Sequence, residues 1–398
     1  MYERKKNGQW SISAWATIDG KRKRIYRTYT PDPELSLKAQ QREARRIEIQ
    51  LEEDIDNGTY DKQTGETITL RSFARTWLDT VIKPSRSPVT YFDYQYLLNA
   101  RILPDLGDTP LTDLSVARLQ QWVSDLSQTH CRTRLGETDE VISASTVQHY
   151  TKLITSILDS AVRFGYLKTN PMQKVETPKA RKPRQHCLDE ERAVDLLRCL
   201  QHEPNYCYRL ALMLALVCGL RLGEVTALRL CNVDFKRCTI DISLAHKYTP
   251  IHGSFNGPPK TQAGVRIITL PAGLMAMLDI EAKHQNECRR LLGDDWHNDG
   301  WIVHAWNGTQ MHKDTPSKWF RRFADKHGFS DICFHELRHS HASILLANNV
   351  DVVAVAARMG HEDVRTTLDT YAHALASRDK ASAAVFDRLM QDADREQA

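Results

Sequence analysis

The sequence lacks any apolar stretch long enough to span a membrane. Its longest apolar run, 210–220, is about half of the ~20 residues that a transmembrane helix needs. Residues 1–10 are charged and polar, unlike the apolar core of a signal peptide. Internal repeats and low-complexity tracts are also absent. With 398 residues, of which 41% are hydrophobic, the chain is expected to be a soluble protein of two or three domains.

Paired cysteines are a second absence. The nine cysteines are odd in number and never spaced as C-x-x-C. This pattern argues against a disulfide framework and against a cysteine zinc site, and it suits a reducing compartment. We therefore expect a cytoplasmic protein.

Net charge is low, at +4, but basic residues are concentrated in two runs. Residues 1–30 are strongly basic, and 178–184 contain no acid. Either run alone is compatible with a solvated face or a linker, whereas two at domain edges favour a nucleic-acid partner. The candidate DNA-binding residues are Lys21, Arg22, Lys23, Arg24, Arg27, Lys179, Arg181, Lys182 and Arg184.

The apolar pattern divides the chain into segments. In 1–62, residues 10–17 and 22–28 alternate as strands around an Asp19-Gly20 turn, and a helix is expected over about 36–56. An arginine- and aromatic-edged ribbon of this kind can lie in a DNA groove.

The segment 67–177 has four apolar helical faces. We expect the first helix to end near Pro84, the second to stop before Pro104, and 128–142 to form a long polar loop. A basic linker, 178–186, precedes the third segment, 187–398. The predicted fold is therefore multidomain α+β: a small β-ribbon plus helix domain, a helical domain, and a mainly α domain with a small antiparallel sheet.

The third segment holds the residues that can do chemistry. A buried helix over 210–219 is followed by Arg221 and Glu224, which are compatible with a structural ion pair or with an anion-binding arginine. Strand-like alternation follows over 239–244 and 264–270, with Lys260 in the Gly/Pro-rich connection between them.

The run His335-Glu336-Leu337-Arg338-His339 allows two interpretations. On a helix, His335 and His339 share a face, which is the zinc-protease geometry, with Glu336 as the base. His335 and Arg338 also share a face and could act together on a phosphate. No distinctive third zinc ligand follows, which favours the phosphate interpretation.

Four strings occur in the order and at the spacing of one family's catalytic boxes: CGLRLGEVTALRLCNVDF, PKTQAGVRIITL, FHELRHSHASILLANNV and RMGHEDVRTTLDTYAH. On these strings, residues 188–376 resemble the catalytic domain of the tyrosine recombinases, the phage and transposon integrases. The upstream segments resemble, less specifically, that family's arm-type DNA-binding domain (1–62) and helical core-binding domain (67–177). The remainder, 187–398, would be the catalytic domain with a C-terminal tail.

The resemblance implies a role for each residue at the site. Arg221 and Arg338 would bind the scissile phosphate, His335 would assist proton transfer, and His361 would hydrogen-bond the phosphate. Lys260 would protonate the leaving 5′ oxygen, although Lys247 lies near it in sequence. Tyr371 would be the nucleophile.

Charge explains why these residue types belong together. A phosphodiester in its transition state gains negative charge, which planar guanidinium groups bind bidentately. Tyr371 is a weak nucleophile because a phenol has a pKa near ~10, so nearby cations must favour its phenolate. This chemistry requires no metal and no cofactor. The covalent link conserves the bond energy, so religation needs no ATP.

The family also implies partners: double-stranded DNA with core and arm sites, a homotetramer on DNA, an excisionase and a host DNA-bending protein. The tail after Tyr371 is amphipathic and could pack on its own domain or on a neighbouring protomer. Three other functions remain open. They are a type IB topoisomerase, a DNA-binding regulator without activity, and a zinc metalloprotease.

Overall fold

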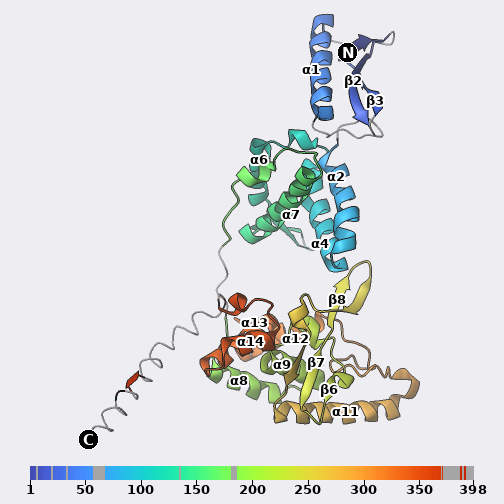
Figure 1. Ribbon diagram of the computed structural model, residues 1–398. Helices are drawn as coiled ribbons and strands as arrows, with labels where there is room; N and C mark the ends of the chain where they lie inside the picture. Colours follow the sequence, from blue (N-terminus) through green and yellow to red (C-terminus); the bar gives the residue numbers. More distant parts are fainter. Residues whose placement is uncertain are drawn as a thin grey trace. The chain divides into compact units, whose positions relative to one another are not determined.

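The computed structural model describes residues 1–5, 8–18, 21–32, 35–56, 68–133, 136–180, 186–368, 370, 386–387 and 390. The chain divides into two compact units, Met1–Pro183 and Arg184–Ala398 (Figure 1). The multidomain α+β prediction is confirmed, because helices dominate both units and every sheet is small and antiparallel. No described helix is long and apolar enough to cross a membrane.

The chain begins with a three-stranded antiparallel sheet that packs on one helix. The elements are β1 (Tyr2–Arg4), β2 (Trp10–Ile18), β3 (Lys21–Tyr29) and α1 (Leu37–Asp56). The predicted alternation is confirmed: Trp10, Ile12, Ala14 and Ala16 are buried in a core with Leu51 of the helix. The predicted turn at 19–20 lies outside the described residues.

The helical part of the first unit has a separate core. Its elements are α2 (Leu70–Trp77), η1 (Leu78–Ile82), α3 (Lys83–Ser85), α4 (Pro88–Leu97), η2 (Leu98–Ile102), α5 (Leu103–Leu106), η3 (Leu111–Asp113), α6 (Val116–Ser127), α7 (Ala144–Arg163) and η4 (Pro171–Lys174). Hydroxyl side chains cap the longer helices, as the sequence favours. The capping residues are Thr69, Ser87, Ser115 and Ser143.

The prediction that the second helix stops before Pro104 is wrong. The helix continues to Leu106, because a π-helical stretch, η2, precedes the proline and the Leu103 N–H donates to the Leu98 carbonyl. A wider turn of this kind accommodates a proline ring that clashes inside an α-helix. The same arrangement precedes Pro84, where the Lys83 N–H donates to Leu78.

The sequence predicted a long polar loop over 128–142. The structure instead forms an antiparallel hairpin there. It comprises β4 (His130–Thr133) and β5 (Gly136–Val141). Its polar sequence is compatible with strands because no strand residue whose side chain the structure describes is buried.

The second unit is built around α9, which is buried almost all round because α11, α12 and α13 pack against it. Its helices are α8 (Glu190–Gln201), α9 (Tyr206–Cys218), α10 (Leu222–Val225), η5 (Leu230–Asn232), η6 (Gln262–Gly264), α11 (Ala272–Leu292), η7 (Gly293–Asp295), α12 (Thr315–His327), α13 (Phe334–Ala347) and α14 (Val352–Met359). This packing explains the unbroken apolar run of the sequence.

The strands of this unit form one small sheet and one hairpin. The sheet has the order β10-β7-β6, and the hairpin joins β8 to β9. The strands are β6 (Val233–Asp234), β7 (Thr239–Ile242), β8 (Ala245–Thr249), β9 (Gly253–Gly257) and β10 (Arg266–Thr269). Side chains alternate along β10: Arg266, the first residue, and Ile268 point inward, whereas Ile267 is exposed. This alternation directs an arginine toward the interior.

Candidate active site of the C-terminal unit

Arg221 is positioned by the glycine that ends α9. Gly219 has a left-handed φ of 67°, and a Cβ there would lie 2.6 Å from the ring of His341 on α13. Only glycine combines this backbone with so close a packing contact. The chain thus turns sharply between α9 and α10, and Arg221 is placed at the N-terminus of α10.

Arg221 is held by Glu224 and by the end of α14. Its Nη1 donates to Glu224 Oε1 at 3.0 Å, and its Nη2 donates to the Gly360 carbonyl at 3.5 Å. The Arg221 side chain keeps 36% exposure, whereas Glu224 has 1%. The structural ion pair considered from sequence is therefore present, and it leaves the guanidinium accessible for an anion.

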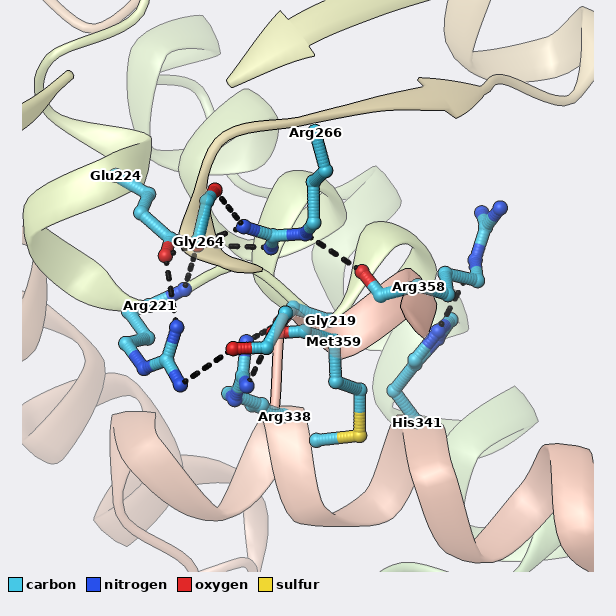
Figure 2. A network of polar contacts seen from close by, with 10 residues as sticks. Gly219, Arg221, Glu224, Gly264, Arg266, Arg338, His341, Arg358 and Met359 are labelled. Carbon is cyan, nitrogen blue, oxygen red and sulfur yellow. Dashed lines mark hydrogen bonds and ion pairs between the residues drawn. The ribbon is translucent and has the colours of Figure 1, made fainter. Parts of the chain in front are cut away.

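Arg338 lies on α13, where it connects two helix ends. Its Nη1 donates to the Gly219 carbonyl at 2.6 Å and its Nη2 to the Met359 carbonyl at 2.5 Å. The side chain is 2% exposed. Figure 2 shows Arg338 and Arg221 on the same side of the network, next to the segment that contains Met359. The two arginines predicted from sequence are thus brought together.

Arg266 is the residue that sequence analysis missed. Its Nη2 donates to Glu224 Oε2 at 3.0 Å, its Nη1 to the Gly264 carbonyl at 2.8 Å, and its Nε to the Arg358 carbonyl at 2.7 Å (Figure 2). The sequence could have indicated it, because Arg266 is two residues from Ile268 in a strand and therefore lies on the same inward face. Arg266 fixes both the carboxylate that holds Arg221 and the end of α14.

The charge of Glu224 is maintained despite its burial. Burial alone would raise the pKa of its carboxyl, but hydrogen bonds and the positive charges of Arg266 and Arg221 hold that pKa below its usual value. Glu224 therefore remains ionised at neutral pH, and it orients both guanidinium groups through charge-assisted hydrogen bonds.

Two histidines of the predicted site lie in the field of these arginines. Desolvation and the positive charges of Arg338 and Arg221 lower the pKa of His335. The same causes lower the pKa of His361 to about 4. His361 Nδ1 is 2.8 Å from the Thr367 hydroxyl, which fixes the ring. Both imidazoles are therefore neutral at neutral pH, suited to hydrogen bonding and proton transfer.

The structure gives Glu336 a role that differs from that of a protease base. Its Oε2 accepts a hydrogen bond from the Cys333 N–H at 2.6 Å, which completes a capping box at the start of α13. A carboxylate used as a helix cap is not directed at a metal-bound water. The HELRH helix thus provides Arg338 and His335 to a site, with Glu336 as its cap.

Lys260 lies in the loop between β9 and η6, and its side chain is exposed. This loop reaches the end of α14, since a Cβ on Gly360 would lie 2.8 Å from the Ala263 carbonyl oxygen. The alternative, Lys247, lies on β8, and its Nζ is close to Gly257 on the paired strand. The assignment of the catalytic lysine to Lys260 stays a prediction.

Several predicted residues cannot be placed. Tyr371, Arg181, Lys182 and Arg184 lie outside the described residues, as do the side chains of Lys21 and Lys23. Lys179 is exposed. The described chain continues past His361 through Thr367, which is buried, to Leu368.

The N-terminal sheet presents a basic aromatic patch on the face opposite α1. The guanidinium of Arg22 lies 5.2 Å from the ring of Trp15, and that of Arg24 lies 5.7 Å from Trp15 and 5.9 Å from Tyr26. Trp15 and Tyr26 are exposed. Arg27 differs, because it forms an ion pair with the buried Asp54 of α1 at 3.2 Å.

Comparison with known proteins gives this site its family. Residues 186–378 match the phage integrase family, and residues 69–127 match the phage integrase N-terminal SAM-like domain. The chain belongs to the phage integrase family of tyrosine recombinases. It is therefore a tyrosine-type site-specific DNA recombinase.

Relatives agree with this membership, and solved structures share the fold. The ICEBs1 integrase of Bacillus subtilis is 26% identical over 76% of this recombinase and 78% of its own length. The integrase of Staphylococcus phage L54a is 23% identical over 86% and 99%. The Tn1549 transposon integrase, solved with transposon right end DNA, shares the fold with a TM-score of 0.65 at 18% identity, covering 79% of this chain and 100% of that one.

Proposed function

We propose that this recombinase is the integrase of a mobile element and that Tyr371 is its nucleophile. The observation that supports the proposal most strongly is the joint placement of Arg221 and Arg338. The carbonyls of Gly360 and Met359 accept hydrogen bonds from their guanidinium groups, directly before His361. These hydrogen bonds connect the two arginines that we propose bind phosphate to the segment that precedes Tyr371 in sequence.

The proposed reaction starts at the scissile phosphate. The Tyr371 oxygen attacks phosphorus, the bond to the 5′ oxygen breaks, and Lys260 donates a proton to that oxygen. The products are a 3′-phosphotyrosine and a free 5′-hydroxyl. Attack by the 5′-hydroxyl of another strand reverses the step and completes strand exchange without ATP.

The arginines and histidines act on the transition state. Arg221 and Arg338 would stabilise the charge that develops on the non-bridging oxygens, a contribution on the order of 10²–10³ in rate for one such donor. His335, neutral because its pKa is lowered, would accept the phenolic proton of Tyr371. His361 would hydrogen-bond the phosphate.

The proposal also covers the DNA sites that the N-terminal unit binds and the proteins that act with this recombinase. The patch of Trp15, Arg22, Arg24 and Tyr26 would bind arm-type sites, while 67–177 and the linker 178–186 would bind core sites. A tetramer of lambda integrase has been solved on a Holliday junction, and it shares the fold with a TM-score of 0.50 at 16% identity. We infer that this recombinase also acts as a tetramer, in the bacterial cytoplasm, with an excisionase and a DNA-bending protein as partners.

A plasmid assay separates recombination from simple relaxation. One supercoiled plasmid would carry two copies of the joined ends of the element, and a control plasmid would carry one. The proposal predicts that the two-site plasmid is resolved into two circles. Relaxation of both plasmids without resolution would instead indicate a topoisomerase, and no change on sites that the protein binds would indicate a regulator.

A further inference from the structure

A buried group of metal-ligating side chains lies far from the arginines. Cys207 is at the start of α9, Glu281 is on α11, and His304 follows the short bridge at Trp301. Their ligand atoms all lie within 4.8 Å of one another, and all three residues are buried. His304 Nε2 is 2.8 Å from Glu281 Oε1.

One oxygen of this group has no hydrogen bond. Glu281 is 0% exposed, yet its Oε2 has no hydrogen-bond partner within the described part of the chain. The ring of His284 is close by, with its Nδ1 3.7 Å from Glu281 Oε2, beyond hydrogen-bond distance. A buried carboxylate oxygen without a partner is costly. A cation between these side chains would satisfy it.

The surroundings of the group favour metal binding. The Ala305 carbonyl can only accept, so His304 Nδ1 donates to it at 2.7 Å, and Nε2 is directed at the cluster. Gln285 Nε2 donates to Glu281 Oε1 at 2.8 Å. Such contacts fix the tautomer and orientation of metal ligands.

We propose that Cys207, Glu281, His284 and His304 bind one Zn²⁺ ion. A thiolate, a carboxylate and two imidazoles are a four-ligand set that zinc accepts in tetrahedral geometry. Ligand atoms ~2.0–2.3 Å from a common ion fit the spacing of Cys207, Glu281 and His304, and His284, with its Nδ1 3.7 Å from Glu281 Oε2, would turn inward to complete the set. His284 is 50% exposed and provides the route of entry.

The ion would be structural. Cys207 and Cys218 are at opposite ends of α9, so about 16 Å of helix, at 1.5 Å per residue, separates the ion from Gly219 and Arg221. The ion would join α9, α11 and the segment of His304, and so fix the helix that positions Arg221. This proposal departs from the expectation that the chain binds no metal, and it does not depend on the proposed function.

Metal content and spectroscopy test the site on the full chain. Protein purified without chelators and dialysed against metal-free buffer should contain about one zinc per chain by elemental analysis. After chelation, added Co²⁺ should produce a thiolate-to-cobalt charge-transfer band, and Zn²⁺ should raise the thermal midpoint. Cys207→Ser should abolish the band and the midpoint shift. The exposed Cys231→Ser is the matched control and should retain both.

A second variant keeps the test decisive if Cys207→Ser does not fold. His284→Ala alters a half-exposed side chain and should weaken zinc affinity at least tenfold. Absence of bound zinc in the wild type would overturn the proposal. Zinc that persists at full stoichiometry in both variants would also overturn it, and would place the ion elsewhere, for instance at His335 and His339.

Discussion

Glu224 organises the active site at the scale of single residues. Its buried carboxylate accepts hydrogen bonds from Arg221 and Arg266, and Arg266 also binds the carbonyls of Gly264 and Arg358. The position of the Arg221 guanidinium is therefore set by Glu224 and, through Glu224, by Arg266. Preorganised donors of this kind avoid reorganisation as charge develops on the phosphate.

Replacement of Arg266 by methionine should uncouple this network. Glu224 would lose a buried charged partner, which destabilises a protein by about 3–5 kcal/mol. We expect a lower thermal midpoint and slower DNA cleavage, measured by differential scanning calorimetry and by covalent adduct formation. The exposed Arg237→Met is the control.

A double variant separates stability from positioning. Arg266→Met combined with Glu224→Gln removes the buried charge that Arg266 no longer pairs with, so most of the thermal stability should return. Cleavage should stay slow, because Arg221 would lack its anionic partner. Recovery of cleavage together with stability would show that the network has no positioning role.

His361 makes stability depend on pH. Its folded-state pKa is about 4, below the ordinary 6.5, so the unfolded chain binds the proton first as the pH falls. This residue therefore reduces stability progressively between about pH 6.5 and pH 4. We expect His361→Gln to lose less thermal stability than wild type on acidification from about pH 7 to pH 5. The exposed His202→Gln is the control, and equal losses in all three proteins would contradict the assignment.

At the scale of elements, the site forms where the C-terminal ends of α9 and α14 meet the N-terminus of α10. The last turns of α9 and α14 are joined by Arg338 of α13, and the loop that contains Lys260 lies against Gly360. Gly360 has a φ of +66°, and a Cβ there would lie 2.8 Å from the Ala263 carbonyl. This glycine permits the close approach.

Two glycines provide a matched comparison. Gly360 and Gly328 both end helices in the left-handed region, but a Cβ on Gly328 would meet nothing within 4 Å. Gly328→Ala should cost only the backbone penalty, about 1–2 kcal/mol. Gly360→Ala should cost more and should also slow cleavage. Equal effects of the two variants on thermal midpoint and adduct formation would argue against this contact.

The sequence predicted elements well where one residue pattern determines them. The apolar face of α7 and the inward residues of β2, such as Ile12, follow directly from periodicity. The extension through Pro104 was missed because a π-helical turn depends on the local backbone and not on an apolar period. Arg266 was missed because its role depends on Glu224, 42 residues away in sequence.

Separation along the chain also limited what could be predicted from the sequence. Cys207, Glu281 and His304 come from three separate segments, so no short motif reveals their proximity. By contrast, Arg221, Arg338 and His361 were predicted from family boxes, and the structure brings them together. The assignments of Lys260 and Tyr371 stay predictions.

At the scale of the whole molecule, the chain divides into two compact units, and its sequence continues beyond Tyr371 with the predicted amphipathic tail. We propose that this tail docks on a neighbouring protomer. Truncation after Arg378 should leave cleavage possible and weaken tetramer formation on DNA, measured by analytical ultracentrifugation of the DNA complex. A tetramer of unchanged stability would instead indicate that the tail packs on its own domain.

Covalent trapping tests the central claim most directly. Nicked duplex DNA with the joined ends of the element would be incubated with wild type or Tyr371→Phe, with and without EDTA. The account predicts a protein–DNA adduct that survives SDS, forms in EDTA and is absent from Tyr371→Phe. An adduct in the variant would assign the nucleophile to another residue. No adduct from wild type on DNA that it binds would contradict the account.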